Sequence, residues 1–351
     1  MDWRYTIMKC SFSNFIIWVL IFLVLWCSPS VIAIGAHTLC KRFLGLTKKQ
    51  QQMCARNPEV MFAVGTGAQI AIKECQEQFK NQRWNCSETP GKRAFGYVFP
   101  VGSREAAAAY GAWSAGISYS ITQECSKGRI PNCSCDYSKK GSSYSEGWKW
   151  GGCSANIKYG GSFAKRFIDA REIEGDARSL MNLHNNRAGR KAVEANVITT
   201  CKCHGVSGSC TLRTCWQTLP PFRDIGNYIK QRFEEARHVR PVRSKKHRKL
   251  VLRIRSISLW KKKRLKSGDL VYLSESPNYC DYNPEIGIIG TGGRKCNKSS
   301  NGPDSCKVLC CGRGYNTLVK TVKRQCQCKF HWCCKVICKV CSEVVEENFC
   351  K

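Results

Sequence analysis

Beyond residue 33 the sequence lacks any apolar run long enough to span a membrane, and acidic residues are scarce throughout its 351 residues. The one long apolar run, from Phe15 to Cys27, follows a basic start and precedes small residues that end at Ala33. Thirteen apolar residues are too few to cross a hydrocarbon core of about 30 Å as a helix. We therefore interpret residues 1–33 as a cleaved secretory signal rather than a membrane anchor. A secreted protein of the extracellular matrix and cell surface is expected.

The sequence has 25 acidic residues against 57 lysines and arginines. The segment from Arg237 to Lys266 holds 14 lysines and arginines and no acidic residue. Such a run repels itself and is not expected to form a packed core. Outside the cell it would meet sulfated glycosaminoglycans or anionic lipid headgroups rather than nucleic acid, so we expect a matrix-retaining linker that binds heparan sulfate. A merely solvated loop is the alternative. The residues expected to bind polyanions are Lys245, Lys246, Arg248, Lys249, Lys261, Lys262, Lys263 and Arg264.

Cysteines, in contrast, are abundant. Of the 26 in the sequence, Cys10 and Cys27 leave with the signal, so the mature chain keeps an even number. In an oxidising secretory context this predicts a disulfide framework of up to twelve bridges. Zinc binding, through the CxxC that ends at Cys341 or through Cys203 and His204, is the competing interpretation. We expect no metal and no cofactor, because the signal places these thiols where disulfides form.

The basic run divides the chain into two predicted domains, since about 318 mature residues exceed one typical core. Residues 34–236 form a helical N-terminal domain, residues 237–267 the basic linker, and residues 268–351 a small cysteine-rich domain held by bridges. Helices are expected from Asn57, over residues 104–124 and over residues 179–200. The first helix carries an apolar stripe of Val60, Val64, Ala68, Ala71, Cys75 and Phe79. The fold class is therefore α+β and disulfide-rich.

The segment from Cys201 to Cys215 holds four cysteines around a glycine-containing centre. Nested pairing, 203 with 210 inside 201 with 215, would make a two-rung hairpin, which we call the thumb. Gly205 and Gly208 permit the positive φ angles of a tight turn and leave no side chains to shield their neighbour. Ser207 would be exposed at the apex, which indicates that the hairpin serves to hold a group at its tip away from the body of the protein.

A serine hydrolase is one alternative explanation of Ser207. The sequence misses the G-x-S-x-G elbow because its last position is Ser209, and no strand-turn-helix context surrounds it. His204 could serve as a base, but neither an orienting acid nor a substrate cleft is visible. We therefore expect no enzyme. A secreted polyanion-binding structural protein is the second alternative, because of the basic run.

A second constellation, from Cys326 to Cys341, also favours nested pairing, with 328 and 338 inside 326 and 341. The adjacent cysteines 333 and 334 could bridge each other into a rigid ring at its centre. Phe330, Trp332 and Val336 would then lie at a tip too narrow to bury them, as in a protein-binding hot spot. The alternative is that these side chains fold back into a core. We call this hairpin the finger.

The thumb sequence resembles the signature of the Wnt family of secreted growth factors, and five further motifs resemble that family in order and spacing. The resemblance extends from about Cys40 to Lys351. The further motifs are Arg83 to Cys86, Trp150 to Ser154, Met181 to Asn186, Cys310 to Gly314 and Cys328 to Cys334.

The resemblance implies a two-domain ligand that controls cell fate and developmental patterning. The thumb would carry a monounsaturated fatty acyl ester on Ser207, added by the acyltransferase Porcupine, and secretion would need a carrier. Thumb and finger would grip the cysteine-rich domain of Frizzled receptors, while a lipoprotein-receptor-related co-receptor binds elsewhere. The residues implied to contact the receptor are His204, Gly205, Val206, Gly208, Phe330, His331, Trp332, Cys333, Cys334 and Val336.

The resemblance also implies a complete disulfide pairing. The pairs in the helical domain are Cys40–Cys54, Cys75–Cys86, Cys125–Cys133, Cys135–Cys153, Cys201–Cys215 and Cys203–Cys210. Those in the cysteine-rich domain are Cys280–Cys311, Cys296–Cys306, Cys310–Cys350, Cys326–Cys341, Cys328–Cys338 and Cys333–Cys334. Three sequons, at Asn85, Asn132 and Asn297, predict glycosylation, and Asn85 and Asn297 match positions glycosylated in the family.

Overall fold

The structure is a computed structural model of the whole chain, and it describes residues 40, 45–87, 99–145, 148–243, 250–255, 265–332 and 334–351. The predicted signal at residues 1–33 lies outside the described residues, as do all eight expected polyanion-binding residues. Within the described segments no helix combines the length and the apolar content that a bilayer crossing requires.

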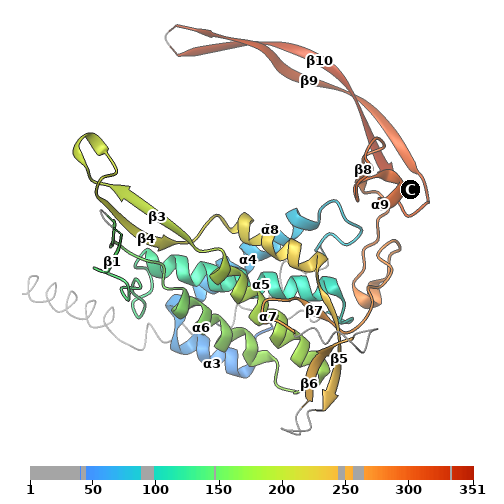
Figure 1. Cartoon of the computed structure of the whole chain (residues 1–351). Helices are drawn as coiled ribbons and strands as arrows, with labels where there is room; N and C mark the ends of the chain where they lie inside the picture. Colours follow the sequence, from blue (N-terminus) through green and yellow to red (C-terminus); the bar gives the residue numbers. More distant parts are fainter. Residues whose placement is uncertain are drawn as a thin grey trace, which may run out of the picture.

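The predicted helical domain is present in the first part of the chain (Figure 1). The apolar stripe predicted for the first helix is confirmed, because all six of its side chains are buried. The helix predicted from residue 104 is also present, and Ser103 caps it, since Ser103 Oγ accepts a hydrogen bond from the backbone N–H of Ala106. The helices are α3 (Lys48–Arg56), α4 (Pro58–Phe79), α5 (Arg104–Ser126), α6 (Ile157–Ile168), α7 (Ala177–Ala195) and α8 (Phe222–Glu234).

Helix α5 is the centre of this domain and is buried on nearly every side. Its alanine-rich sequence allows neighbouring helices to pack closely against it. A Cβ atom at Gly67 of α4 would lie 2.5 Å from the carbonyl oxygen of Gly116 in α5, so only glycine permits this approach. A helix that is apolar all round is expected only where other helices enclose it.

The third predicted helix ends earlier than expected. Helix α7 stops at Ala195, and strand β3 (Ile198–Cys203) begins three residues later. The run from Val197 to Thr200 consists of β-branched residues, which fit a strand better than a helix because their χ1 freedom is lost against the preceding helical turn. The early end of α7 therefore starts the thumb.

A four-stranded sheet holds the thumb, in the order β1-β2-β4-β3. Strands β3 and β4 (Arg213–Thr218) are antiparallel, and β4 pairs in parallel with β2 (Trp148–Trp150). Strand β1 (Ser143–Ser145) completes the sheet. The thumb is thus supported by a second hairpin from an earlier part of the chain.

The described ends of the basic segment are not an unpacked linker, and that expectation is wrong for them. Strand β5 (Arg237–Arg243) pairs with β6 (Leu250–Ile254) and with β7 (Val271–Tyr272). Val239 is buried in the helical core, and so are Leu270 and Val271, which lie beyond the predicted boundary at residue 268. Apolar residues spaced between the cations anchor the segment to the body while the charged side chains face outward.

The C-terminal domain has a small core made almost entirely of cysteines. Beside this core, 3-10 helix η3 (Pro284–Ile286), strand β8 (Lys295–Cys296) and helix α9 (Cys306–Leu309) are short. Strands β9 (Tyr315–His331) and β10 (Lys335–Cys350) form a long antiparallel hairpin that arches away from the helices (Figure 1). Disulfides therefore replace apolar burial here, as expected for a domain of this size.

Two arginines join the domains at the end of α4. Arg83 donates from Nε and Nη2 to the carbonyl oxygen of Val308, at 3.1 and 3.0 Å. In the other direction, Arg294 donates to the carbonyl oxygens of Lys80, Gln82 and Arg83, at 2.9, 2.7 and 2.7 Å. Lys80 is the C-cap of α4, and Gln82 and Arg83 follow it in the next turn, so the Arg294 guanidinium satisfies carbonyl oxygens at and just beyond the helix end.

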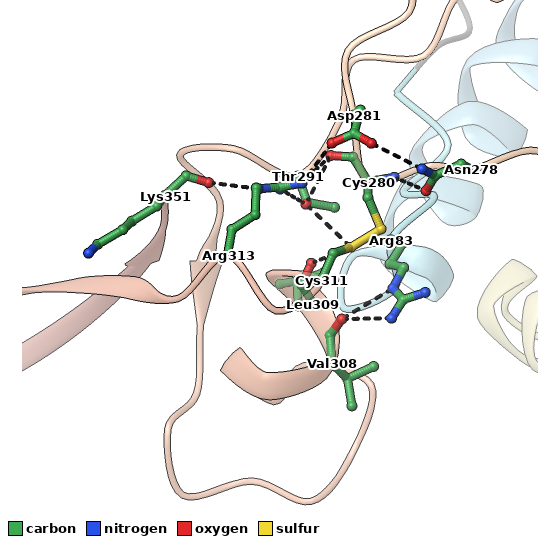
Figure 2. A network of polar contacts seen from close by, with 10 residues as sticks. All are labelled: Arg83, Asn278, Cys280, Asp281, Thr291, Val308, Leu309, Cys311, Arg313 and Lys351. Atoms are coloured by element: carbon green, nitrogen blue, oxygen red, sulfur yellow. Dashed lines mark hydrogen bonds and ion pairs between the residues drawn. A yellow bond between two sulfur atoms is a disulfide. The ribbon is translucent and has the colours of Figure 1, made fainter.

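Figure 2 shows how the C-terminal domain is tied together beside this junction. Arg313 donates to the carbonyl oxygens of Cys280 and Lys351, at 3.0 and 3.1 Å, and to Asp281 Oδ1 at 3.0 Å. It also donates to the hydroxyl of Thr291. One side chain thus connects the start of the domain to its last residue.

Candidate functional site

The thumb is a hairpin with two disulfide rungs. Cys201 pairs with Cys215 across the strands, with their Cα atoms 4.1 Å apart. Cys203 and Cys210 form the second rung, with their Cα atoms 4.7 Å apart. The tip beyond this rung is therefore covalently closed and cannot separate from the strands.

The apex of the thumb presents Ser207 to solvent. Ser207 lies in a short 3-10 turn, η2 (Val206–Gly208), and has a positive φ of 54°. Val206 beside it is 91% exposed. Gly208 has the expected positive φ of 78°, but Gly205 does not. Gly205 is required for a different reason, because a Cβ there would lie 2.6 Å from the backbone carbonyl oxygen of Ser209, which cannot rotate away as a side chain can.

His204 is held against the strand below the tip. Its backbone N–H donates to the carbonyl oxygen of Leu212 at 2.7 Å, and its Nε2 lies 3.0 Å from Thr214 Oγ1. The partner of its ring is thus a neutral threonine hydroxyl. No carboxylate forms an ion pair with His204 in the part of the chain that the structure describes. The arrangement does not resemble a base oriented by an acid.

A pair of tryptophans in β2 flanks the thumb, and their role was not predicted. The Arg213 guanidinium lies 5.1 Å from the centre of the Trp148 ring, and Lys139 Nζ lies 4.9 Å from the centre of the Trp150 ring. The first contact joins β4 to β2, and the second joins the turn before β1 to β2. The alternating Trp-Lys-Trp sequence was the available signal, since it places both rings on one face of a strand.

The finger is the far end of the β9–β10 hairpin. Cys326 pairs with Cys341, and Cys328 with Cys338. Between these rungs the register shifts by one residue, and Gln327 takes a positive φ of 46°. This is a β-bulge, which increases local twist and redirects the tip.

The tip of the finger exposes large apolar side chains. Phe330 is 67% exposed, Trp332 96% and Val336 59%, so they do not fold back into a core. His331 and Cys334 are also exposed, and Cys334 has a positive φ of 74°. Further apolar side chains along the strands are exposed without having been predicted; among them are Val319, Val340 and Val344.

Eleven disulfides lie between described residues, and they are eleven of the twelve pairs that the resemblance implies. The twelfth involves Cys333, which lies outside the described residues; Cys334 is exposed and has no disulfide partner among the cysteines that the structure describes. The pairing of Cys333 with Cys334 stays a prediction. The cysteines suggested as zinc ligands are all oxidised in these bridges, so they offer no thiolate.

The three sequons differ in surroundings. Asn132 and Asn297 are exposed, whereas Asn85 is half-buried. Asn297 Oδ1 accepts hydrogen bonds from the backbone N–H and the hydroxyl of Ser299, at 3.0 and 2.9 Å. Ser87 makes the same two contacts to Asn85. Glycosylation of each site stays a prediction.

Comparison with known proteins now adds to this geometry. A family model described as the Wnt family matches residues 42–351. The chain belongs to the Wnt family. Protein Wnt-2 of Drosophila melanogaster is 45% identical over 328 residues, which cover 89% of this chain and 92% of that protein.

A solved structure with the description "Human WLS in complex with WNT8A" is also similar, with 38% identity and a TM-score of 0.58. The match covers 83% of this chain and 93% of the solved chain. The predicted α+β, disulfide-rich fold class is thus confirmed. Members of the Wnt family are secreted signalling ligands without a cofactor rather than enzymes, and this chain is a signalling ligand of that family.

Proposed function

We propose that this protein activates Frizzled-family receptors through a monounsaturated acyl group on Ser207 and through the hydrophobic tip of the finger. The observation that carries the proposal is the position of Ser207, exposed at the apex of a hairpin closed by two disulfides. An esterifying enzyme such as Porcupine could reach this hydroxyl without unfolding the protein. A rigid base then holds the acyl chain away from the body.

The acyl chain would supply most of the affinity on the thumb side. Burial of roughly ten methylenes in a receptor groove, at about 0.8 kcal/mol each, contributes on the order of 8 kcal/mol before ordering costs. Val206 is the one large apolar side chain of the η2 turn, and a single valine supplies only about 1.5–3 kcal/mol. The lipid therefore acts as the ligand's main anchor.

The finger would supply the second contact. Phe330 and Trp332 lie on a hairpin whose two disulfides limit the freedom of its backbone, so little backbone entropy is lost on binding. Large aromatic side chains on such a surface are typical of binding hot spots. In Figure 1 the thumb and the finger extend from the molecule in the same general direction, which suits a receptor domain bound by both.

Further partners follow from the same proposal. One acyl chain gives only reversible membrane binding and poor solubility, so transport needs a carrier. The human WNT8A relative was solved in complex with WLS, and we propose an equivalent carrier for this chain. A lipoprotein-receptor-related co-receptor would bind elsewhere on the surface. Heparan sulfate, bound by the lysines and arginines between residues 245 and 264, would retain the protein in the matrix.

The test is the Ser207→Ala variant, with Ser209→Ala as its matched control. Both serines are exposed on the same hairpin, and neither change removes a disulfide. We expect Ser207→Ala to abolish both the acyl mass increment and receptor activation in a reporter assay, while Ser209→Ala retains both. Normal signalling by secreted Ser207→Ala protein contradicts the proposal. Covalent labelling of Ser207 by a fluorophosphonate would instead support a hydrolase.

A further inference from the structure

A cleft of about 660 Å³ lies on the helical domain, lined by residues of α6 and α7. It is separate from the thumb and the finger, and its lining residue His184 contacts the carbonyl oxygen of Asp269 just beyond the end of the basic segment. Its volume lies within the range of sites that bind small ligands. Five basic side chains line it: Lys158, Lys165, Arg187, Arg190 and Lys191.

Two carboxylates also line the cleft, but each already has a cationic partner. Asp169 accepts two hydrogen bonds from Arg190, at 3.1 and 3.0 Å, and one from Asn186 Nδ2 at 3.2 Å. Glu194 forms an ion pair with Lys191. The remaining three cations therefore determine the charge of the cleft.

Those three cations are Lys158, Lys165 and Arg187, and none has an ion-pair partner among the residues that the structure describes. All three are exposed. Cations usually spread apart over a surface, because mutual repulsion costs free energy. Here three of them gather around one cleft whose two carboxylates already have cationic partners, so the cleft carries a net positive charge that attracts anionic ligands.

Helix geometry places these groups along the two walls. Lys158 and Lys165 are seven residues apart, so they lie on one face of α6 and about 10 Å apart along its axis. Gly161 and Ser162 lie between them and also line the cleft. A Cβ atom at Gly161 would have Ser118 Oγ, 3.8 Å away, as its nearest neighbour. Small residues thus keep the middle of this wall open.

We propose that this cleft binds a compact ligand that carries at least two sulfate or phosphate groups. The two lysines stand at opposite ends of one wall, about 10 Å apart along the helix axis, so each can contact a separate anionic group of one ligand. Arg187 supplies a planar fork that matches the oxygens of a sulfate or phosphate, and the two lysines act as point charges. The site does not depend on the acyl group or on the finger.

The test uses the full chain in which Lys245, Lys246, Lys261 and Lys262 are replaced by glutamine, which weakens competition from the basic segment. Two probes, a heparin-derived tetrasaccharide and inositol hexakisphosphate, are titrated by calorimetry. The cleft variant is Lys165→Gln with Arg187→Gln. The matched control, Lys48→Gln with Lys49→Gln, removes the same charge from exposed positions on α3.

We expect the cleft variant to bind at least one probe at least tenfold more weakly, and the α3 control to change affinity less than twofold. The more strongly affected probe identifies sulfate or phosphate as the preferred group. Ser162→Glu is a second variant that keeps every cation but places a carboxylate in the cleft, and it should weaken binding similarly.

Equal affinity of the cleft variant and its parent for both probes overturns the proposal, and so does an equal loss in the α3 control. A reporter assay on the same proteins separates this result from the proposed receptor function, because acylation of Ser207 is unaffected by these changes. Circular dichroism and counting of free thiols establish that each variant is folded.

Discussion

Removal of the inner rung of the thumb should loosen the tip without unfolding the protein. The Cys203→Ala/Cys210→Ala variant opens a ring of eight residues and leaves the Cys201–Cys215 bridge intact. In a free chain, closing such a ring restricts the unfolded state by about 2.5 kcal/mol. The outer ring already limits these residues, so this figure is an upper bound. It corresponds to an increase of up to about 70-fold in the equilibrium constant for local opening of the tip.

Hydrogen exchange measured by mass spectrometry is the assay. The reporting amides are those of Gly205, Gly208 and Ser209, which donate to backbone carbonyls across the turn at 2.8, 2.9 and 3.1 Å. They should exchange several-fold to 70-fold faster, while the helices of the body keep their protection. The matched control is Cys328→Ala/Cys338→Ala, which removes the corresponding rung of the finger and should leave the thumb unchanged.

Unchanged protection at these three amides would refute the reasoning, because the turn would then be stable through its own hydrogen bonds. Global unfolding of the variant would also refute the reasoning, because the Cys203–Cys210 disulfide would then be required for the whole fold and not only for the tip. The acyl mass increment on Ser207 reports on function in the same samples. If a rigid tip is required for esterification, acylation should fall together with protection.

Three further predictions concern the finger, a buried acid and the domain junction. Trp332→Ala should weaken binding to a Frizzled cysteine-rich domain about 30-fold, the loss typical of a 2 kcal/mol hot spot, whereas Tyr282→Ala, an exposed aromatic outside both hairpins, should bind normally in a biosensor. Burial raises the pKa of the Glu172 carboxyl above its ordinary value of 4.5, so the folded state keeps this carboxyl protonated to a higher pH than the unfolded state does. The free energy of unfolding therefore falls as the pH rises from the unfolded-state pKa through the folded-state pKa. Glu172→Gln should therefore raise the unfolding temperature at pH 7, and an equal rise for exposed Glu174→Gln would contradict the assignment. Arg294→Ala should lower the free energy of unfolding by about 2 kcal/mol in a urea titration, because it leaves carbonyls at the end of α4 without their charged partner; an unchanged midpoint would exclude this role.

Much of this architecture was predictable because its signals are local. The stripe from Val60 to Phe79 has helical spacing, and its burial follows from that period. The thumb and the finger were predictable as hairpins because nested cysteines flank short turn sequences. Exposure of Trp332 follows from the narrowness of such a tip, whatever the rest of the fold does.

Other features required contacts between distant segments. Val239 lies within a run that reads as a charged linker, yet it is buried because β5 pairs with β7 from beyond the run. We predicted a positive φ at Gly205, whereas glycine is needed there because a Cβ atom would clash with the backbone carbonyl oxygen of Ser209. A close approach of this kind depends on how the turn closes, which turn propensities alone do not specify.

Disulfide spacing and turn residues act over fewer than twenty positions, so the order of residues was enough to specify which of them are held out from the body. The support of the thumb and the junction of the domains depend instead on contacts between distant segments. The pairing of β2 with β4, the clasp of Arg83 and Arg294, and the cation-lined cleft between α6 and α7 all join residues distant in the chain. Such contacts form only after the core around α5 has brought the helices together, since that packing, and no local propensity, sets the distances between them.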